Sequence, residues 1–117
     1  MTNEELKART KQFALRVIKL VEALPNTKAA DVLGRQVLRS ATSVMANYRS
    51  ALRARSRAEF ISKIGIVEEE IDESQGWLEL IVEAGLLPAV KVTALIKEAD
   101  ELTAIFVATG RTAKHRR

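Results

Sequence analysis

Residues 56–85 read SRAEFISKIGIVEEEIDESQGWLELIVEAG and carry the clearest structural signal in the chain. Apolar or small residues recur there at alternating steps of four and three, which is typical of a helix with one seam in a bundle. The seam holds Phe60, Ile64, Val67, Ile71, Ser74, Leu78 and Ile81. Ser56 and Glu59 have the spacing of a capping box, and Gly85 suits the left-handed residue that ends many helices. We therefore expect one long amphipathic helix over this stretch.

Three other segments, residues 3–24, 28–54 and 88–110, show the same helical periodicity. Their seams hold Leu6, Thr10, Phe13, Val17, Leu20 and Leu24, then Leu33, Val37, Ser40, Val44, Tyr48 and Ala51, and finally Val92, Leu95, Ala99, Leu102 and Phe106. Pro25 cannot continue the first helix, Pro88 suits a first turn, and Gly110 is expected to end the last helix. Asn47 lies beside the core of helix 28–54, where we expect a buried hydrogen bond that fixes register rather than a binding role.

Four amphipathic helices joined by short loops favour an all-α fold, an up-and-down antiparallel four-helix bundle. Strand patterns are absent from the sequence. We expect residues 1–110 to form the bundle and residues 111–117 to form a basic C-terminal tail. The chain of 117 residues is the size of one ordinary domain.

The composition excludes several classes of protein. Hydrophobic residues make up 47% of the chain and charged residues 29%, which indicates a folded domain. The acidic N-terminus and the lack of a long apolar run argue against a secretory signal and a membrane span, so we expect a cytoplasmic protein with no membrane partner. The net charge is +4, and four of the 19 basic residues lie in residues 111–117, which leaves 15 against 15 acidic residues elsewhere. The bundle itself is therefore neutral overall.

Catalytic and metal-binding patterns are missing from the body of the chain. There is no cysteine, and the single histidine, His115, lies in the expected tail. A thiol or serine nucleophile with a histidine base is therefore excluded. Glu68, Glu69, Glu70 and Glu73 could form a carboxylate site, but di-iron bundles need Glu-x-x-His pairs. We expect no enzyme, no cofactor, no metal and no small-molecule substrate.

One face of helix 28–54 carries a stripe of four arginines, Arg35, Arg39, Arg49 and Arg53, interleaved with small residues. At about 100° per residue this stripe lies opposite the apolar seam. Arginines in such a row could follow a phosphate backbone. The alternative, which we favour on sequence alone, is a solvated face with acidic partners on helix 56–85 or another subunit, because the stripe has no stacking aromatics.

Helix 56–85 has a second apolar strip, formed by Ile66, Trp77 and Leu80 beside Gly65 and Gly76. An exposed tryptophan is a typical anchor of protein interfaces, and glycines allow another helix to come close. We predict a subunit interface here. The alternative is that Trp77 packs within the bundle as part of a wide core face.

These motifs resemble the bacterial four-helix-bundle proteins known as the 23S rRNA intervening-sequence protein family. The resemblance rests on GRQVLRSATS at residues 34–43, ANYR at residues 46–49 and the motifs from Glu59 to Leu86. It implies a bundle that assembles into a homo-oligomeric ring, often a pentamer, and relatives of this kind include nucleic-acid binders. The resemblance points to no enzymatic activity. Glu68 and Glu69 stand where relatives often carry basic residues, which weakens a nucleic-acid role for that face.

The leading hypothesis is therefore a non-enzymatic binding or scaffolding module that assembles with itself and contacts RNA or DNA. The competing hypothesis is a protein–protein interaction adaptor with no nucleic-acid role, in which the charged faces are only solvated or paired with each other.

Overall fold

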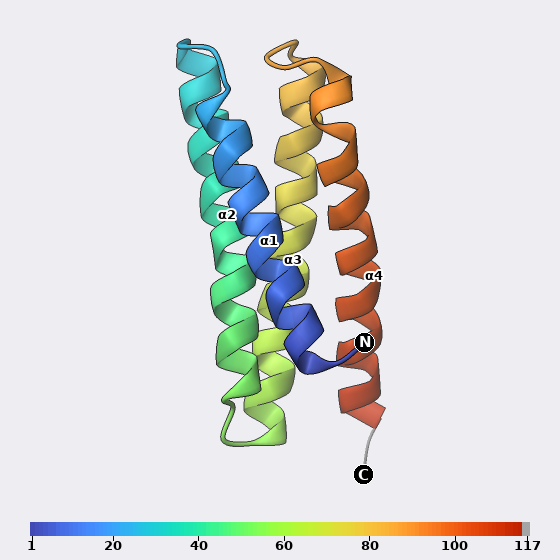
Figure 1. The fold of residues 1–117 in the computed structure, drawn as a ribbon. Helices are drawn as coiled ribbons and strands as arrows, with labels where there is room; N and C mark the ends of the chain where they lie inside the picture. Colours follow the sequence, from blue (N-terminus) through green and yellow to red (C-terminus); the bar gives the residue numbers. More distant parts are fainter. Residues whose placement is uncertain (116–117) are drawn as a thin grey trace.

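The architecture comes from a computed structural model that describes residues 1–115 of the chain. The helices are α1 (Asn3–Glu22), α2 (Lys28–Leu52), α3 (Arg57–Glu83) and α4 (Thr93–His115), with a 3₁₀ turn at Ala89–Lys91. Consecutive helices run in opposite directions along one elongated bundle of 50 × 21 × 20 Å (Figure 1). No strand occurs in the described residues. The predicted up-and-down four-helix bundle is confirmed.

Side chains at the helix starts accept hydrogen bonds from backbone N–H groups that have no partner within the helix. At α1 the capping box is complete: the Thr2 hydroxyl accepts from the Glu5 N–H (3.0 Å) and the Glu5 carboxylate from the Thr2 N–H (3.3 Å). At α3 only half of the predicted box forms. The Ser56 hydroxyl accepts from the Glu59 N–H at 3.0 Å, but the Glu59 carboxylate takes the N–H of Arg55.

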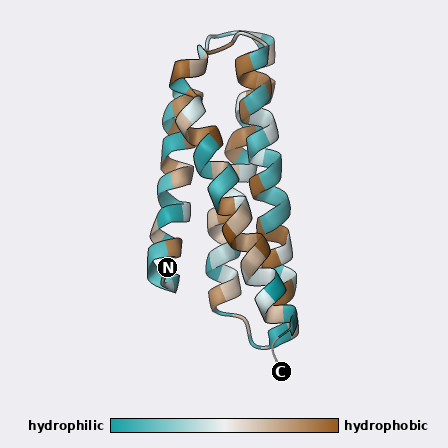
Figure 2. Ribbon diagram, turned by 90° about the vertical axis from the view of Figure 1, so that its right-hand side faces the viewer, coloured by the Kyte–Doolittle hydropathy of each residue, from teal (hydrophilic) through white to brown (hydrophobic). Residues whose placement is uncertain are grey.

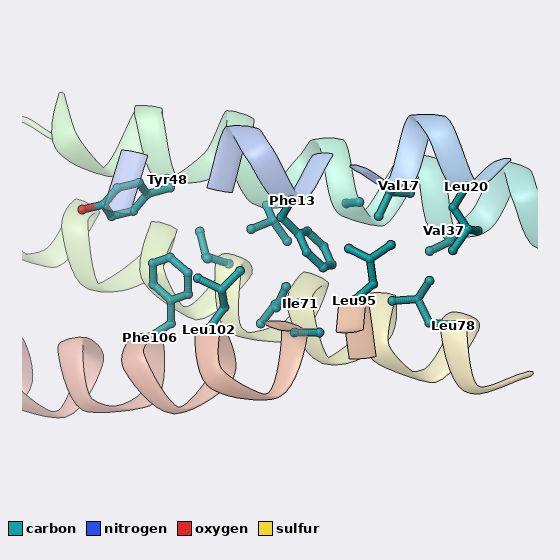
Figure 3. Close-up of a cluster of buried hydrophobic side chains, with 14 of the residues drawn as sticks. Phe13, Val17, Leu20, Val37, Tyr48, Ile71, Leu78, Leu95, Leu102 and Phe106 are labelled. Atoms are coloured by element: carbon teal, nitrogen blue, oxygen red, sulfur yellow. The ribbon is translucent and has the colours of Figure 1, made fainter. Parts of the chain in front are cut away.

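The four seams meet in one continuous apolar core. Phe13, Val44, Ile71 and Leu102, one residue from each helix, are fully buried. The rings of Tyr48 and Phe106 meet edge to face with centroids 5.3 Å apart (Figure 3). Hydrophobic and hydrophilic segments alternate along the helices (Figure 2). Each large apolar side chain that leaves water contributes roughly 1.5–3 kcal/mol to folding, so this core is the main source of stability.

A pair of serines, and not Asn47, joins helices inside the bundle. The hydroxyls of Ser40 on α2 and Ser74 on α3 are 2.8 Å apart, and both residues are fully buried. Asn47 donates instead to the carbonyl and hydroxyl oxygens of Ser43, one turn earlier in the same helix. The prediction that Asn47 fixes the register between helices is therefore wrong, because its amide is satisfied locally.

Gly85 ends α3 as predicted, with a positive φ of 72° that glycine adopts without strain. The prediction that Gly110 ends α4 is wrong, since the helix continues to His115. A Cβ atom at Gly110 would lie 2.8 Å from Oε1 of Glu68 and 3.4 Å from a methyl group of Ile64. Gly110 thus allows α3 and α4 to approach closely, and residues 111–115 of the predicted tail are helical. Residues 116–117 lie outside the described part.

The other predicted helix ends need smaller corrections. α1 and α2 each end two residues earlier than expected, and α4 begins at Thr93 after the 3₁₀ turn that follows Pro88. In the part of the chain that the structure covers, every helix is too short or too polar to cross a bilayer.

α1 packs chiefly against α2 and touches α4 more lightly, so polar contacts matter at the α1–α4 side. Arg9 donates from Nε and Nη2 to the two carboxylate oxygens of Glu98, at 2.8 and 2.7 Å, and reaches Glu101 at 3.0 Å. The hydrogen bond from Arg9 lowers the pKa of Glu98 below its ordinary value. This bidentate pair of Arg9 and Glu98 holds α1 beside α4.

Candidate nucleic-acid interface

The first two arginines of the α2 stripe already have carboxylate partners. Arg39 donates from Nη1 to Glu70 on α3 at 2.8 Å and from Nη2 to Glu73. The hydrogen bond to Glu70 raises the pKa of the Arg39 guanidinium. Arg35 forms an exposed pair with Asp31, one turn away on α2, at 3.2 Å. For Arg39 the structure contains the acidic partners on helix 56–85 that the alternative expected, whereas Arg35 pairs within its own helix.

The last two arginines of the stripe are different. Arg49 and Arg53 are both exposed, and neither forms an ion pair with any other residue in the range 1–115. They line a shallow hollow on the outer side of α2 together with Met45, Ala46 and Ser50. Their charge is therefore available to an external anion.

Further basic residues gather at the same end of the molecule. Arg53, Arg55 and Arg57 alternate with small residues through the α2–α3 loop. Arg57 donates to the backbone oxygens of Ala113 and Lys114, both at 2.7 Å.

These two bonds fasten the last turn of α4 beside the α2–α3 loop, at the lower end of the bundle in Figure 1. Besides Arg57, whose guanidinium is bonded to α4, five exposed arginine and lysine side chains lie at this end: Arg49, Arg53, Arg55, Arg111 and Lys114. We call these five residues the basic end. Three carboxylates lie near it: Glu59 accepts from the Arg55 N–H and Glu5 from the Thr2 N–H, while Glu4 is exposed at the start of α1.

The outer face of α3 has the opposite charge. α3 contains eight carboxylates and only two basic residues, Arg57 and Lys63. Glu69, Asp72 and Glu79 are exposed on it. A surface of this sign repels a phosphate backbone. The electrostatics therefore disfavour nucleic-acid contact on the outer face of α3.

The predicted interface strip on α3 is only partly exposed. Ile66 and Leu80 are exposed by 36% and 45%, but Trp77 is half-buried and packs against the core. The indole N–H of Trp77 donates to Glu73 at 3.3 Å. Trp77 therefore packs partly within the bundle, as the alternative expected, and is not a freely exposed anchor. Gly65 and Gly76 have open space where a Cβ would lie, so packing within this chain does not require either glycine.

A hollow of about 680 Å³ opens between the start of α3 and the end of α4. Met1, Phe60, Ile105 and Ala108 contribute to its apolar lining. Among residues 1–115 its lining includes no carboxylate and no imidazole. The hollow is suited to holding an apolar side chain.

Comparison with known proteins assigns the chain to a family. Residues 3–108 match the family model described as the 23S rRNA-intervening sequence protein. The chain belongs to this family. The crystal structure of a protein of unknown function from the S23 ribosomal protein family of Bacteroides thetaiotaomicron has the same fold, with a TM-score of 0.88 and 31% identity. The match covers 96% of this chain and 100% of that chain. No curated protein matches the chain significantly.

In this member of the family, sequence reasoning singled out Arg49 and Arg53 but not Arg55 and Arg57, which lie at the same end of the bundle. The signal was present in the run RARSR at residues 53–57, which is basic at every second position. Its meaning depends on the contact of Arg57 with the end of α4, residues distant in sequence, which helical periodicity does not reveal.

Proposed function

We propose that this chain is a non-enzymatic, self-assembling four-helix bundle that binds the phosphate backbone of RNA or DNA through its basic end. One observation supports the proposal most: Arg49 and Arg53 are exposed, lack a carboxylate partner within residues 1–115 and share one end of the bundle with Arg55, Arg111 and Lys114. Lysines and arginines that neutralise phosphates release counterions, which gives affinity without base recognition. The family description refers to 23S rRNA, so RNA is the first ligand to test.

Arg35 and Arg39 contribute less in this proposal. Their carboxylate partners Asp31, Glu70 and Glu73 compensate their charge and would have to be displaced by phosphate. The bundle also offers few aromatic faces for base stacking, because Tyr48 is buried and Trp77 is half-buried. The proposed binding is accordingly sensitive to salt and weakly selective for sequence.

In this proposal the chain assembles into a homo-oligomeric ring, a pentamer. The subunits contact each other through the α3 strip of Ile66, Leu80 and the exposed edge of Trp77. The open space beside Gly65 and Gly76 supports this, since another helix could approach there. Light scattering on Leu80→Glu tests the interface without disturbing the core contact of Trp77. A mass equal to that of the unaltered protein would reject the strip as an interface.

The experiment that tests binding compares two double variants with equal change in charge. Arg49→Glu with Arg53→Glu alters the basic end, while Lys19→Glu with Lys91→Glu alters exposed residues at the opposite end. Fluorescence anisotropy with a single-stranded RNA and an RNA hairpin, at about 50 mM salt, measures affinity. We expect at least a tenfold loss for the arginine pair, and less than a twofold loss for the lysine pair. Equal losses, or no binding by the unaltered chain, would overturn the proposal.

The adaptor function remains the second candidate, because the exposed carboxylates of α3 suit a basic protein partner. A pull-down with and without nuclease separates the two functions. Partners that survive nuclease, together with absent RNA binding in the anisotropy experiment, would favour the adaptor.

A further inference from the structure

A central stretch of α4 carries no charge on any side. Residues 102–110, LTAIFVATG, make two and a half turns without a charged residue. Leu102 and Phe106 point into the core, yet Ala104, Val107 and Ala108 are exposed. We call residues 102–110 the uncharged belt. A helix that is apolar all round is normally buried on all sides, so its outward face is a candidate contact surface.

α2 contains a run of the same length, residues 40–48, that serves as a comparison. Its positions outside the core are mixed: Ala46 is exposed and Met45 is half-buried, while Thr42, Ser43 and Asn47 carry hydroxyl and amide groups. In the belt of α4 the hydroxyls of Thr103 and Thr109 donate to carbonyl oxygens of α4 itself, and the exposed residues are all apolar. The belt therefore differs from the α2 run in exposing three apolar residues instead of one.

The apolar surface of the belt continues into the hollow described above. Ile105 and Ala108 belong to both, and Phe60 and Met1 extend the hollow toward α3 and the N-terminus. The hollow is open because α1 packs chiefly against α2 and leaves this part of α4 uncovered. Belt and hollow together form one apolar surface on the α4 side of the bundle.

The charged residues on either side of the belt indicate which kind of partner its surface would bind. Asp100 lies just before the belt and Arg111 just after it, on the same side of α4 as Ala104, and both are exposed. Neither forms an ion pair within residues 1–115. At 1.5 Å per residue they lie about 9 and 8 Å from Phe106 along the helix axis. An acid and a base at equal distances on either side of an apolar centre are complementary to the same surface of a second copy that runs in the opposite direction.

We propose that two copies of this chain pair through the uncharged belt, with their α4 helices antiparallel about a two-fold axis near Phe106. In this arrangement Ala104 packs against Ala108 of the partner subunit. Asp100 meets Arg111 of the partner subunit, and symmetry repeats each contact. Val107 lies beside its own symmetry copy, and Ile105 approaches its copy on the flank that faces the hollow. A small two-fold contact of this kind uses one surface patch on both subunits.

This pairing deepens the self-assembly part of the proposed function, and it uses α4 rather than the α3 strip. Its failure is therefore distinguishable from failure of RNA binding, which is measured with variants of Arg49 and Arg53, and from failure of the α3 interface, which is measured with Leu80→Glu.

Two single variants and their mixture test the pairing. In Asp100→Arg each symmetric contact becomes two arginines, and in Arg111→Asp it becomes two acids. Each purified variant should therefore lose the contact, and the assembly mass in sedimentation velocity should fall by half. When the two variants are mixed, every contact again joins an arginine to an acid, so the mass of the unaltered protein should return. Circular dichroism checks that both surface variants remain folded.

Glu22→Arg is the matched control, since it makes the same charge change at an exposed position on α1, outside both proposed interfaces. It should leave the mass unchanged. A monomeric unaltered chain, single variants that keep the full mass, or a mixture that fails to restore it would each overturn the proposal, as would an equal loss in the control.

Discussion

The two halves of the α2 arginine stripe have the same spacing and different surroundings. Arg39 faces Glu70 and Glu73 on α3, and Arg35 reaches Asp31. Arg49 and Arg53 lie about three and four turns beyond Arg39 on the same face, close in sequence to Arg55 and Arg57, and have no ion pair in the described part of the chain. Periodicity assigns residues to a face, but the neighbouring helix determines whether their charge is compensated. We infer that the first half contributes to stability and the second half to binding.

Reversing an arginine in the compensated half should have the largest effect on folding. Arg39→Glu places a third carboxylate beside Glu70 and Glu73, and we expect a loss of about 1–2 kcal/mol in the free energy of unfolding, limited by solvent exposure. Urea denaturation measures the loss. Arg49→Glu is the control and should change stability by less than about 0.5 kcal/mol. Equal losses at the two positions would remove the distinction between the halves.

Arg9 offers a second compensated arginine, more enclosed than Arg39. Glu98→Gln weakens the pair that holds α1 beside α4, and we expect a loss of about 1 kcal/mol at neutral pH. Because the pKa of Glu98 is lowered in the folded protein, its ionised form stabilises the fold. That stabilisation is complete above the unfolded-state pKa and is lost as the pH falls through the folded-state value.

Urea denaturation of both proteins across acidic pH tests this sign. The stability difference between the unaltered chain and Glu98→Gln should shrink toward acid. A difference that stays constant or widens would contradict the assignment.

Removing the carboxylates that pair with Arg39 should make this part of the stripe behave like the uncompensated second half. Glu70→Gln with Glu73→Gln leaves Arg39 without an acidic partner, so we expect RNA affinity to rise about threefold and its salt dependence to increase by up to one phosphate. Anisotropy titrations at several salt concentrations measure both. Arg39→Ala in the same background should cancel the gain. A gain that persists would come from reduced repulsion alone.

The smallest effect is expected at Arg35. Both side chains of its pair with Asp31 are exposed, and such pairs on a helix contribute about 0.3–0.5 kcal/mol to stability. Arg35→Ala should therefore shift the urea midpoint only slightly and reduce RNA affinity by less than twofold. A loss as large as that of Arg53→Ala would show that exposed pairing does not compensate the charge.

Much of the fold was predictable because local rules and the core agree. The seam of α3 was correct, since Ile64, Ile71 and Leu78 repeat at heptad spacing and are fully buried. The prediction that Gly110 ends α4 was wrong because glycine occurs both at helix ends and where two helices come close. Only the position of Glu68 on the neighbouring helix shows that Gly110 belongs to the second case.

The site was less predictable than the fold. The stripe containing Arg49 and Arg53 followed from helical geometry, but the pairing of Arg39 and the link from Arg57 to the end of α4 are contacts between helices. Trp77 shows the same limit, since its partial burial depends on neighbours that residue spacing does not specify.

The salt dependence of RNA binding tests the central claim most directly. Arg49→Ala with Arg53→Ala and Arg35→Ala with Arg39→Ala remove the same charge from the two halves of one stripe. We predict that the first pair lowers the slope of log affinity against log salt by about 1.4–1.8, the amount for two phosphates, and the second by less than half of that. Equal slopes for the two variants, or a larger change in the second, would contradict the account.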